Sequence, residues 1–370
     1  MNTPRFIDIH ILQTLPYNNI NRDDLGSPKQ LVYGGVDRTR VSSQAWKRVT
    51  RLSVEQQVGE QTARTRRVPE QVAQRLEGRG WPGELAAHAG AQVLLSAGKD
   101  GLKNEKGATN VLLYLPLAAL DALADLAEQH REAIEKQLGA KKPTPALPVD
   151  EVAAILKSCN GTIHLFGRML AELPGGEVDG AVQVAHAFTT HGTEPEVDFF
   201  TAVDDLNPAE AKGSGHMNSG EFSSGVFYRY ANIDIAGLAE RLTDPEMTRE
   251  LTSAFLTAFA ASMPTGKQHA TAAQSLPDLV HVSVRSDRPV SLAAAFEAPV
   301  RAEADGWAAP SQSALSSYAS RLHRFWGTDG LVWSGYASVS DKPLDGMGTA
   351  ADSFGSLVTQ ALGAAFEGRS

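Results

Sequence analysis

The segment Arg38–Arg51 holds five basic side chains and no acidic one, in a chain of 370 residues whose formal net charge is −9. The Ser42–Ser43 pair followed by apolar spacing predicts a helix start. At such a start, exposed backbone N–H groups and the positive end of the helix dipole lie among the cations, which favours a bound phosphate. A solvated face of a surface helix is the plain alternative.

The distribution of charge helps to choose between a phosphate site and a solvated helix face. On a helix with about 3.6 residues per turn, the basic side chains fall on one face and the apolar ones on the adjoining face. Residues 1–67 carry 11 Lys or Arg against 6 Asp or Glu, whereas the remaining residues carry 23 against 37. Positive charge is thus confined, which suits one anionic ligand in a defined groove better than indiscriminate polyanion binding. The basic face holds Gln44, Lys47, Arg48 and Arg51, and the apolar face holds Ala45, Trp46, Val49 and Leu52.

A second candidate for nucleic-acid contact is a long hairpin. A strand at Val197–Asp205, a polar and glycine-rich stretch, and a second strand at Gly225–Ile235 predict that it projects from the fold. Its aromatic side chains can stack on bases or wedge between them, or can pack within the hairpin or sheet. Gly266–Gln268 adds a cation on a flexible turn. The aromatic residues concerned are Phe199, Phe200, Phe227 and Tyr228.

The sequence offers few groups of residues whose types and spacing could support catalysis. His186 and His191 are five residues apart, which places them on different helical faces and excludes a helical metal pair. The Asp204–Asp205 pair is more typical of a turn cap than of a Mg²⁺ site. Asp37, beside the basic segment, is the better candidate for metal-dependent RNA cleavage, although it lacks an evident second ligand. No cofactor is expected.

Composition indicates an ordinary globular protein, with 42% hydrophobic residues. The single cysteine, Cys159, excludes an internal disulfide and a thiolate metal cluster, and fits a reducing cytoplasm. The longest apolar stretch, Val111–Leu120, is short and contains Pro116, so no membrane span is expected. The first residues lack the pattern of a signal peptide, and the expected location is cytoplasmic.

Periodicity predicts a mixed fold. Phe6–Leu12 alternates between isoleucines and the pair Asp8 and His10, which is typical of a half-buried strand. Residues 60–158 read as a helical insertion, Glu246–Met263 as an amphipathic helix and Leu279–Arg285 as another strand. Split strand–helix–strand units with long insertions predict an α+β, ferredoxin-like fold.

Several segments together resemble one family, the CasC backbone subunit of the type I-E CRISPR surveillance complex Cascade. They occur in family order and are spread from residue 6 to about residue 300. The segments are Phe6–His10, Asn21–Asp24, Tyr33–Gly35, Arg40–Gln44 with Lys47–Arg48, Gly167–Met169, Val178–Gly180, Ala185–Ala187 with Thr189–His191, Asp198–Leu206 and Glu221–Asn232.

The resemblance implies a non-catalytic scaffold shaped like a right hand. It implies an RRM-like palm, a helical fingers insertion and a β-hairpin thumb that displaces one base of a CRISPR RNA at regular intervals. Copies stack along the guide and present it to target DNA, together with other Cascade subunits. The expected boundaries are residues 1–60 and 161–300 for the palm, 61–160 for the fingers, about 192–224 for the thumb, and 301–370 for the C-terminal part of the palm.

The resemblance also implies contact residues. RNA phosphates fall on the palm loop and helix, the displaced base lies beside Met169, and the thumb and a turn supply the rest. The expected RNA contacts are Arg22, Lys29, Ser42, Gln44, Lys47, Arg51, Met169, Phe199, Phe200, Thr201, Val203, Lys267 and Gln268, to which the basic helix face adds Arg48. In the family, the fingers meet target DNA through lysines, and the available ones are Lys103, Lys106, Lys141 and Lys142.

Two other hypotheses stay open. Related type III backbone subunits cleave target RNA through a loop aspartate, which makes a metal-dependent ribonuclease acting through Asp37 the alternative. The chain can also be an RNA-binding module unrelated to CRISPR, with a surface for self-association.

Overall fold

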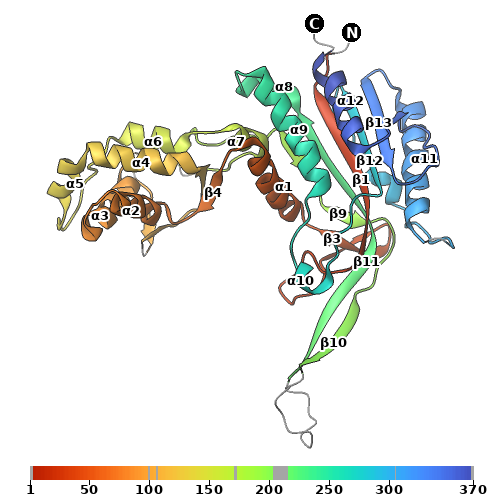
Figure 1. Cartoon of the computed structure of the whole chain (residues 1–370), viewed down its shortest axis with the longest axis horizontal. Helices are drawn as coiled ribbons and strands as arrows, with labels where there is room; N and C mark the ends of the chain where they lie inside the picture. Colours follow the sequence, from red (N-terminus) through yellow and green to blue (C-terminus); the bar gives the residue numbers. More distant parts are fainter. Residues whose placement is uncertain are drawn as a thin grey trace, which may run out of the picture. The chain divides into compact units, whose positions relative to one another are not determined.

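The computed structural model describes residues 3–98, 101–105, 107–170, 173–202, 216–304 and 306–367. The chain forms two compact units, one of residues 1–53, 182–240 and 252–370 and the other of residues 54–181 and 241–251. The first contains a large sheet and the second is mainly helical (Figure 1). The chain is therefore a mixed α+β protein, as the sequence predicts.

The sheet of the first unit is built around β1 (Phe6–Asn18), which pairs antiparallel with β11 (His216–Asp234) and β12 (Leu279–Arg285). On one side, β11 lies between β1 and the strands β8 (Val182–Val184) and β9 (Ala187–Thr189), which follow α1 (Ser43–Val58) in the chain. On the other side, β1 lies between β11 and β12, and α9 (Pro245–Ala261) connects these two strands. This is a split strand–helix–strand arrangement. The sheet continues through β13 (Leu331–Ser338) and β14 (Thr349–Ala350) on one side, and through β8 (Val182–Val184), β9 (Ala187–Thr189), β3 (Val36–Val41) and β2 (Gln30–Tyr33) on the other.

One face of this sheet is covered by α1 (Ser43–Val58) and α9 (Pro245–Ala261). Arg229 pairs with the fully buried Ile11 on this face. Its guanidinium lies 3.7 Å from the ring centroid of Trp46 in α1 and 4.7 Å from that of Phe259 in α9. A buried cation between two aromatic faces thus holds both helices against the sheet.

The opposite face is covered by α11 (Ala308–Trp326), whose Leu315 and Ala319 belong to the same core cluster as Tyr228. Asp8 and His10, which point to this face, are therefore buried as well. The half-buried strand expected from alternation is wrong, because β1 is central and has a layer on each side. The periodicity of one strand cannot show whether a distant part of the chain covers its second face.

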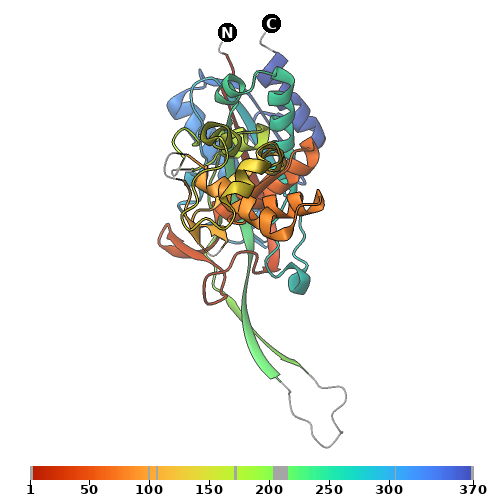
Figure 2. The same ribbon diagram turned by 90° about the vertical axis from the view of Figure 1, so that its left-hand side faces the viewer.

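The hairpin consists of β10 (Glu196–Ala202) paired antiparallel with the first part of β11. The same β11 continues without interruption into the centre of the sheet, beside β1. In both views the hairpin extends well beyond the other strands (Figures 1 and 2). A single long strand therefore joins the projection to the core. Residues 203–215, with the predicted Val203 and the Asp204–Asp205 pair, lie outside the described residues.

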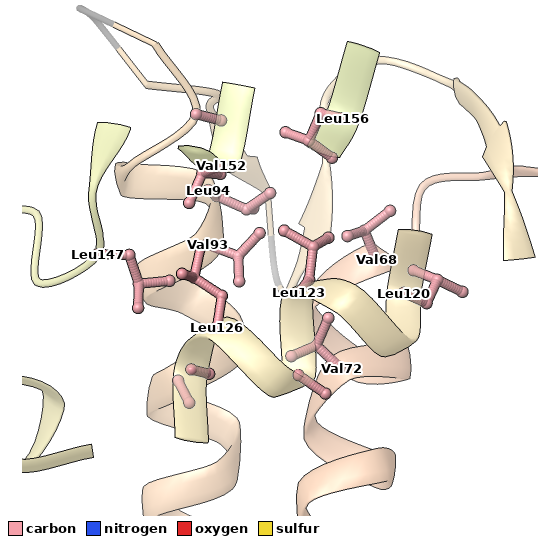
Figure 3. Close-up of a cluster of buried hydrophobic side chains, with 14 of the residues drawn as sticks. Val68, Val72, Val93, Leu94, Leu120, Leu123, Leu126, Leu147, Val152 and Leu156 are labelled. Carbon is pink, nitrogen blue, oxygen red and sulfur yellow. The ribbon is translucent and has the colours of Figure 1, made fainter. Parts of the chain in front are cut away.

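The second unit has a core made mostly of aliphatic side chains, among them Val72, Leu120 and Leu123 (Figure 3). Gly90 allows close packing of two helices, because a side chain there would overlap the carbonyl group of Pro69. The helices are α2 (Val68–Gly78), α3 (Gly83–Leu95), α4 (Leu117–Gln129), α5 (Arg131–Gln137), α6 (Val149–Lys157) and α7 (Gly161–Phe166), with short strands β4 (Thr62–Thr65), β5 (Asn104–Glu105), β6 (Ala108–Thr109) and β7 (Leu113–Pro116).

Four shorter or terminal elements complete the chain. They are α8 (Ile235–Arg241), α10 (Gln268–Thr271), the 3₁₀ helix η1 (Ala293–Phe296) and α12 (Phe354–Phe366). Across the described parts of the chain, no helix has both the length and the apolar character needed to cross a bilayer.

Candidate nucleic-acid interface

The asparagines that follow β1 tie its loop to the base of the hairpin. The side-chain amide of Asn18 donates to the carbonyl oxygen of Ser223 at 2.8 Å. That of Asn19 donates to the carbonyl oxygens of Glu221 and Gly26, both at 2.8 Å. These side-chain bonds to backbone carbonyl oxygens fix the loop beside β11.

The next asparagine joins the same loop to the start of α1. The Asn21 side-chain oxygen accepts from the Ser42 N–H at 2.8 Å, and its carbonyl oxygen accepts from the Lys29 N–H at 3.1 Å. The Arg40 N–H donates to the carbonyl oxygen of Lys29 at 2.7 Å. Lys29, Arg40 and the helix start are therefore brought together around Asn21. Arg40 lies within the basic segment but is not among the contacts that the resemblance implies.

The N–H groups at the helix start are largely occupied, which corrects the expectation that they are exposed. The Ser43 N–H donates to Nδ1 of His186 at 3.0 Å, and the Ala45 N–H donates to the Ser42 hydroxyl at 3.3 Å. Burial, with the charges of Arg40 and Lys29, lowers the pKa of His186, so the neutral ring can accept this bond. Anion binding here must therefore rely mainly on cationic side chains.

These cations differ in exposure. Arg22 and Arg48 are exposed, as is Gln44, whereas Lys29, Arg40 and Lys47 are half-buried. Arg51 is buried and has an interaction partner, so the basic face expected for α1 is only partly open. We define the palm site as the cations of this region that are exposed or half-buried, namely Arg22, Lys29, Arg40, Lys47 and Arg48.

Arg38 has a structural role. It is fully buried, and its guanidinium donates to the carbonyl oxygens of Thr189 and Phe296, both at 2.9 Å, and to that of Tyr33 at 3.2 Å. These charge-assisted bonds offset the cost of burying the charge. Arg38 therefore joins β2, β9 and the last residue of η1 (Ala293–Phe296), and is not available to a ligand.

The turn before α10 lies against the loop that carries Arg22. A side chain at Gly266 would place its Cβ 2.7 Å from the carbonyl oxygen of Ile20, so only glycine allows this approach. Lys267 has φ 55°, a left-handed conformation that is costly for a non-glycine residue. The Gln268 amide group donates within the turn, to the carbonyl oxygen of Ala273 at 3.2 Å. The structure thus places Lys267 beside the loop, but uses the donors of Gln268 internally.

The aromatic residues of the hairpin differ from those of the sheet. Phe199 is 70% exposed and Phe200 45% exposed, and their adjacent positions in β10 place them on opposite faces of the hairpin. Thr201 is exposed as well. Phe227 and Tyr228 are buried in the sheet, so the stacking role considered for them is wrong. They belong to the part of β11 that both covering layers enclose.

Phe200 is the less free of the two hairpin phenylalanines. Its ring lies 3.9 Å from the position that a Cβ would take at Gly220. Phe222, two residues further along β11, stacks on Tyr17 with ring centroids 4.3 Å apart. Phe200 is therefore partly supported by an aromatic row at the hairpin base, whereas Phe199 is the more available for a base.

The described hairpin, residues 196–202 and 216–224, contains Glu196, Asp198 and Glu221 but no lysine or arginine. It therefore has no means of binding phosphate by charge attraction. Apolar and aromatic contact is the interaction that its composition allows.

Met169, in the second unit, has a strongly exposed side chain, and the neighbouring Arg168 anchors its backbone. Arg168 is buried and donates to the carbonyl oxygens of Gly176, Lys157 and Ser158 at 2.7–2.8 Å. Its backbone N–H and C=O pair with those of Val178 at 2.8 Å. Met169 itself is 86% exposed. An apolar side chain is thus presented to solvent from an anchored backbone, which is suited to contact with a flat ligand surface.

The remaining candidates are on the surface. Lys103, Lys141 and Lys142 are exposed in the second unit, and Lys106 lies outside the described residues. Asp37 is exposed on β3 in the first unit. Among the residues that the structure describes, no three His, Cys, Asp or Glu side chains are grouped so that they could hold a metal ion.

Comparisons with known proteins place this geometry in a family. A family model described as CT1975-like protein matches residues 7–360. The chain belongs to this family. No curated protein matches it.

Two chains in solved structures are highly similar to this one. One chain of a structure described as "CRISPR RNA-guided surveillance complex, pre-nicking" is 51% identical, with a TM-score of 0.93, over 98% of this chain and 100% of its own length. Another, from a "CRISPR RNA-guided surveillance complex", is 43% identical, with a TM-score of 0.83, over 97% of this chain and 99% of its own. The similarity therefore extends over the palm site, the hairpin and the second unit.

Proposed function

We propose that this CT1975-like protein is a guide-RNA-binding backbone subunit of a CRISPR RNA-guided surveillance complex. The observation that carries the proposal is the 51% identity, over almost the whole chain, with a subunit of such a complex. The palm site and the exposed hairpin phenylalanine support it independently, because they are the two kinds of contact that a single-stranded nucleic acid needs.

In this function, the palm site binds the sugar-phosphate backbone without reading its sequence. The hairpin inserts Phe199 at intervals and leaves the other bases free to pair, so base pairing supplies the specificity. We propose that the subtype is I-E Cascade, that the palm is RRM-like, and that copies of the chain polymerise along the guide. The strand order β12, β1, β11 and β8 supports the RRM-like assignment. Lys103, Lys141 and Lys142 are the proposed contacts to target DNA.

The decisive experiment is to purify the protein from its host and size the nucleic acid that accompanies it. We expect RNA of uniform length that contains spacer sequence, protected in segments of regular spacing. Recovery free of nucleic acid, or with RNA of random length and origin, would contradict the proposal.

We propose further that the chain is not an enzyme. Cleavage through Asp37 is the less favoured alternative, and it is tested by incubating the guide-bound protein with Mg²⁺ and RNA complementary to the guide. Regularly spaced cuts that disappear in Asp37→Asn would establish the nuclease, whereas intact RNA supports the scaffold.

A further inference from the structure

A cavity of about 360 Å³ lies between α11 and the second face of the sheet. It is separate from the palm site and from the hairpin, and the function proposed above does not use it. Its floor comes from β1 and β12, and its rim from α11 and the segment after β12. The polar side chains that line it include His10, His281, Ser283, Arg285, Arg288 and His323.

The charge of this cavity is positive. Two arginines line it, and among the described residues no aspartate or glutamate does. Arg285 is buried, and its Nε and Nη2 each lie 3.1 Å from an Asp287 carboxylate oxygen. The guanidinium groups of Arg285 and Arg288 both line the cavity, so an anion bound there would accept charge-assisted hydrogen bonds from them.

Asp8 is a second carboxyl group near Arg285, and its oxygens already accept hydrogen bonds from other residues. It accepts from the Tyr230 hydroxyl at 2.7 Å and from the Val290 N–H at 3.1 Å. Burial raises the pKa of Asp8 to about 7, so its negative charge is weakened at neutral pH. The cavity therefore retains a positive character in a chain that is acidic overall.

Two imidazole rings form part of the cavity floor, and an indole lies at its rim. His10 stacks on His281 with ring centroids 5.4 Å apart and on Tyr230 at 5.0 Å, because these residues are opposite one another in neighbouring strands. Burial lowers the pKa of His10 and lowers that of His281 to about 4, so both rings are neutral. Trp326 lies at the rim and is 65% exposed. A large indole left in solvent beside cations is a surface on which a planar ligand can stack.

We propose that this cavity binds a nucleotide, with the phosphate on Arg285 and Arg288 and the base against Trp326. The cavity lies at the small end of the range of about 300–1,000 Å³ that ligand pockets occupy, which suits one nucleotide. The nucleotide can be free or can be the phosphorylated end of a strand, since both present the same chemistry.

The test is isothermal titration calorimetry on the full chain, freed of RNA, with AMP, adenosine and inorganic phosphate. We expect AMP to bind, phosphate to bind more weakly and adenosine to bind weakest. Trp326→Ala should weaken AMP binding roughly tenfold, because the base loses its stacking partner, and should leave phosphate binding unchanged. Arg288→Ala should weaken both ligands to a similar degree.

Neighbouring residues supply matched controls. Phe325 is 82% exposed and Arg324 is exposed, yet neither lines the cavity. Phe325→Ala and Arg324→Ala should leave AMP binding unchanged, as should Lys29→Ala in the palm site. All these positions are exposed or half-buried, so loss of folding is not expected, and far-ultraviolet circular dichroism checks it.

Three results would overturn the proposal: no binding of AMP, equal weakening by Trp326→Ala and Phe325→Ala, or loss of AMP binding in Lys29→Ala. A trinucleotide with a 5′-phosphate identifies the source, since equal or tighter binding than AMP indicates a strand end, and much weaker binding indicates a free nucleotide. Guide RNA recovered with Trp326→Ala measures the proposed function separately, because the two sites share no residue.

Discussion

The palm site and the hairpin belong to the same unit and are joined by the same loop, yet their chemistry is opposite. The palm site gathers Arg22, Lys29 and Arg40 around Asn21, whereas the described hairpin carries three carboxylates and no lysine or arginine. One region can attract a phosphate chain, and the other can only stack or wedge. A protein that must hold a strand without covering its bases needs both, in separate places.

The difference predicts that the palm site and the hairpin contribute to guide affinity in physically different ways. Phosphate binding by cations releases counterions and therefore depends steeply on salt concentration, while aromatic stacking does not. Variants in the two regions should thus be distinguishable by salt dependence as well as by affinity.

The largest effect is expected from Lys29→Ala combined with Arg40→Ala. If each cation contributes about 1.5 kcal/mol through charge-assisted bonds, guide affinity should fall roughly a hundredfold at low salt. The slope of log K against log salt should become shallower by about 1.4, because each phosphate of a single strand that the protein no longer neutralises accounts for about 0.7. Filter binding at several salt concentrations measures both quantities.

The control for this pair is Lys342→Ala combined with Arg321→Ala, two exposed cations of the same unit. Their removal changes the net charge equally and should alter neither affinity nor slope appreciably. If the control pair weakens binding as much as the palm pair, general charge attraction would explain the effect, and the comparison of regions would fail.

The next effect is expected from Phe199→Ala. Guide affinity should fall roughly tenfold, because stacking on a base is worth about 1–3 kcal/mol, and the salt slope should stay the same. Phe200→Ala is the matched change, and its effect should be smaller because that ring is partly supported near Gly220 and Phe222. Nuclease footprints should lose their regular spacing in Phe199→Ala. A changed salt slope would show that the hairpin acts through charge after all.

The sequence predicts the strands, helices and charged segments of these regions better than it predicts the contacts between them. Strict alternation and apolar spacing identify β12 and α1, and the charge bias of the first residues identifies the palm site. Local pattern cannot show that His186, 143 residues from Ser43, accepts an N–H that the sequence alone would leave free. Nor can it show which aromatic residues of β11 leave the core, since one strand runs through both environments.

The burial of Arg38 shows the same limit. In the sequence it is one of five cations, but the carbonyl oxygens that bind it come from β2, β9 and the end of η1. Only the fold decides which member of a charge cluster is structural, because long-range packing determines its neighbours.

A smaller effect is expected from Asn21→Ala, which removes the acceptor for the Ser42 N–H. Stability should fall by about 1 kcal/mol, the usual cost of losing one hydrogen bond, and guide affinity should fall a few-fold because the loop and helix start lose their register. Thermal unfolding and filter binding measure the two effects. Asn21→Asp restores the acceptor but adds a negative charge, so it should recover stability without recovering affinity. Recovery of both would show that Asn21 acts only as a hydrogen-bond acceptor, with no phosphate nearby.

The smallest effect is expected from neutralising the hairpin, with Asp198→Asn combined with Glu196→Gln. These carboxylates are exposed, so at low salt their removal should strengthen guide binding only about twofold to threefold, and the gain should vanish as salt rises. The same substitutions leave Phe199 in place, and the footprint spacing should therefore stay regular. A weaker complex would mean that the carboxylates themselves hold the strand, for example by accepting hydrogen bonds from base edges. The hairpin would then be a polar reader of the guide, and the division between a charged palm and an apolar wedge would have to be abandoned.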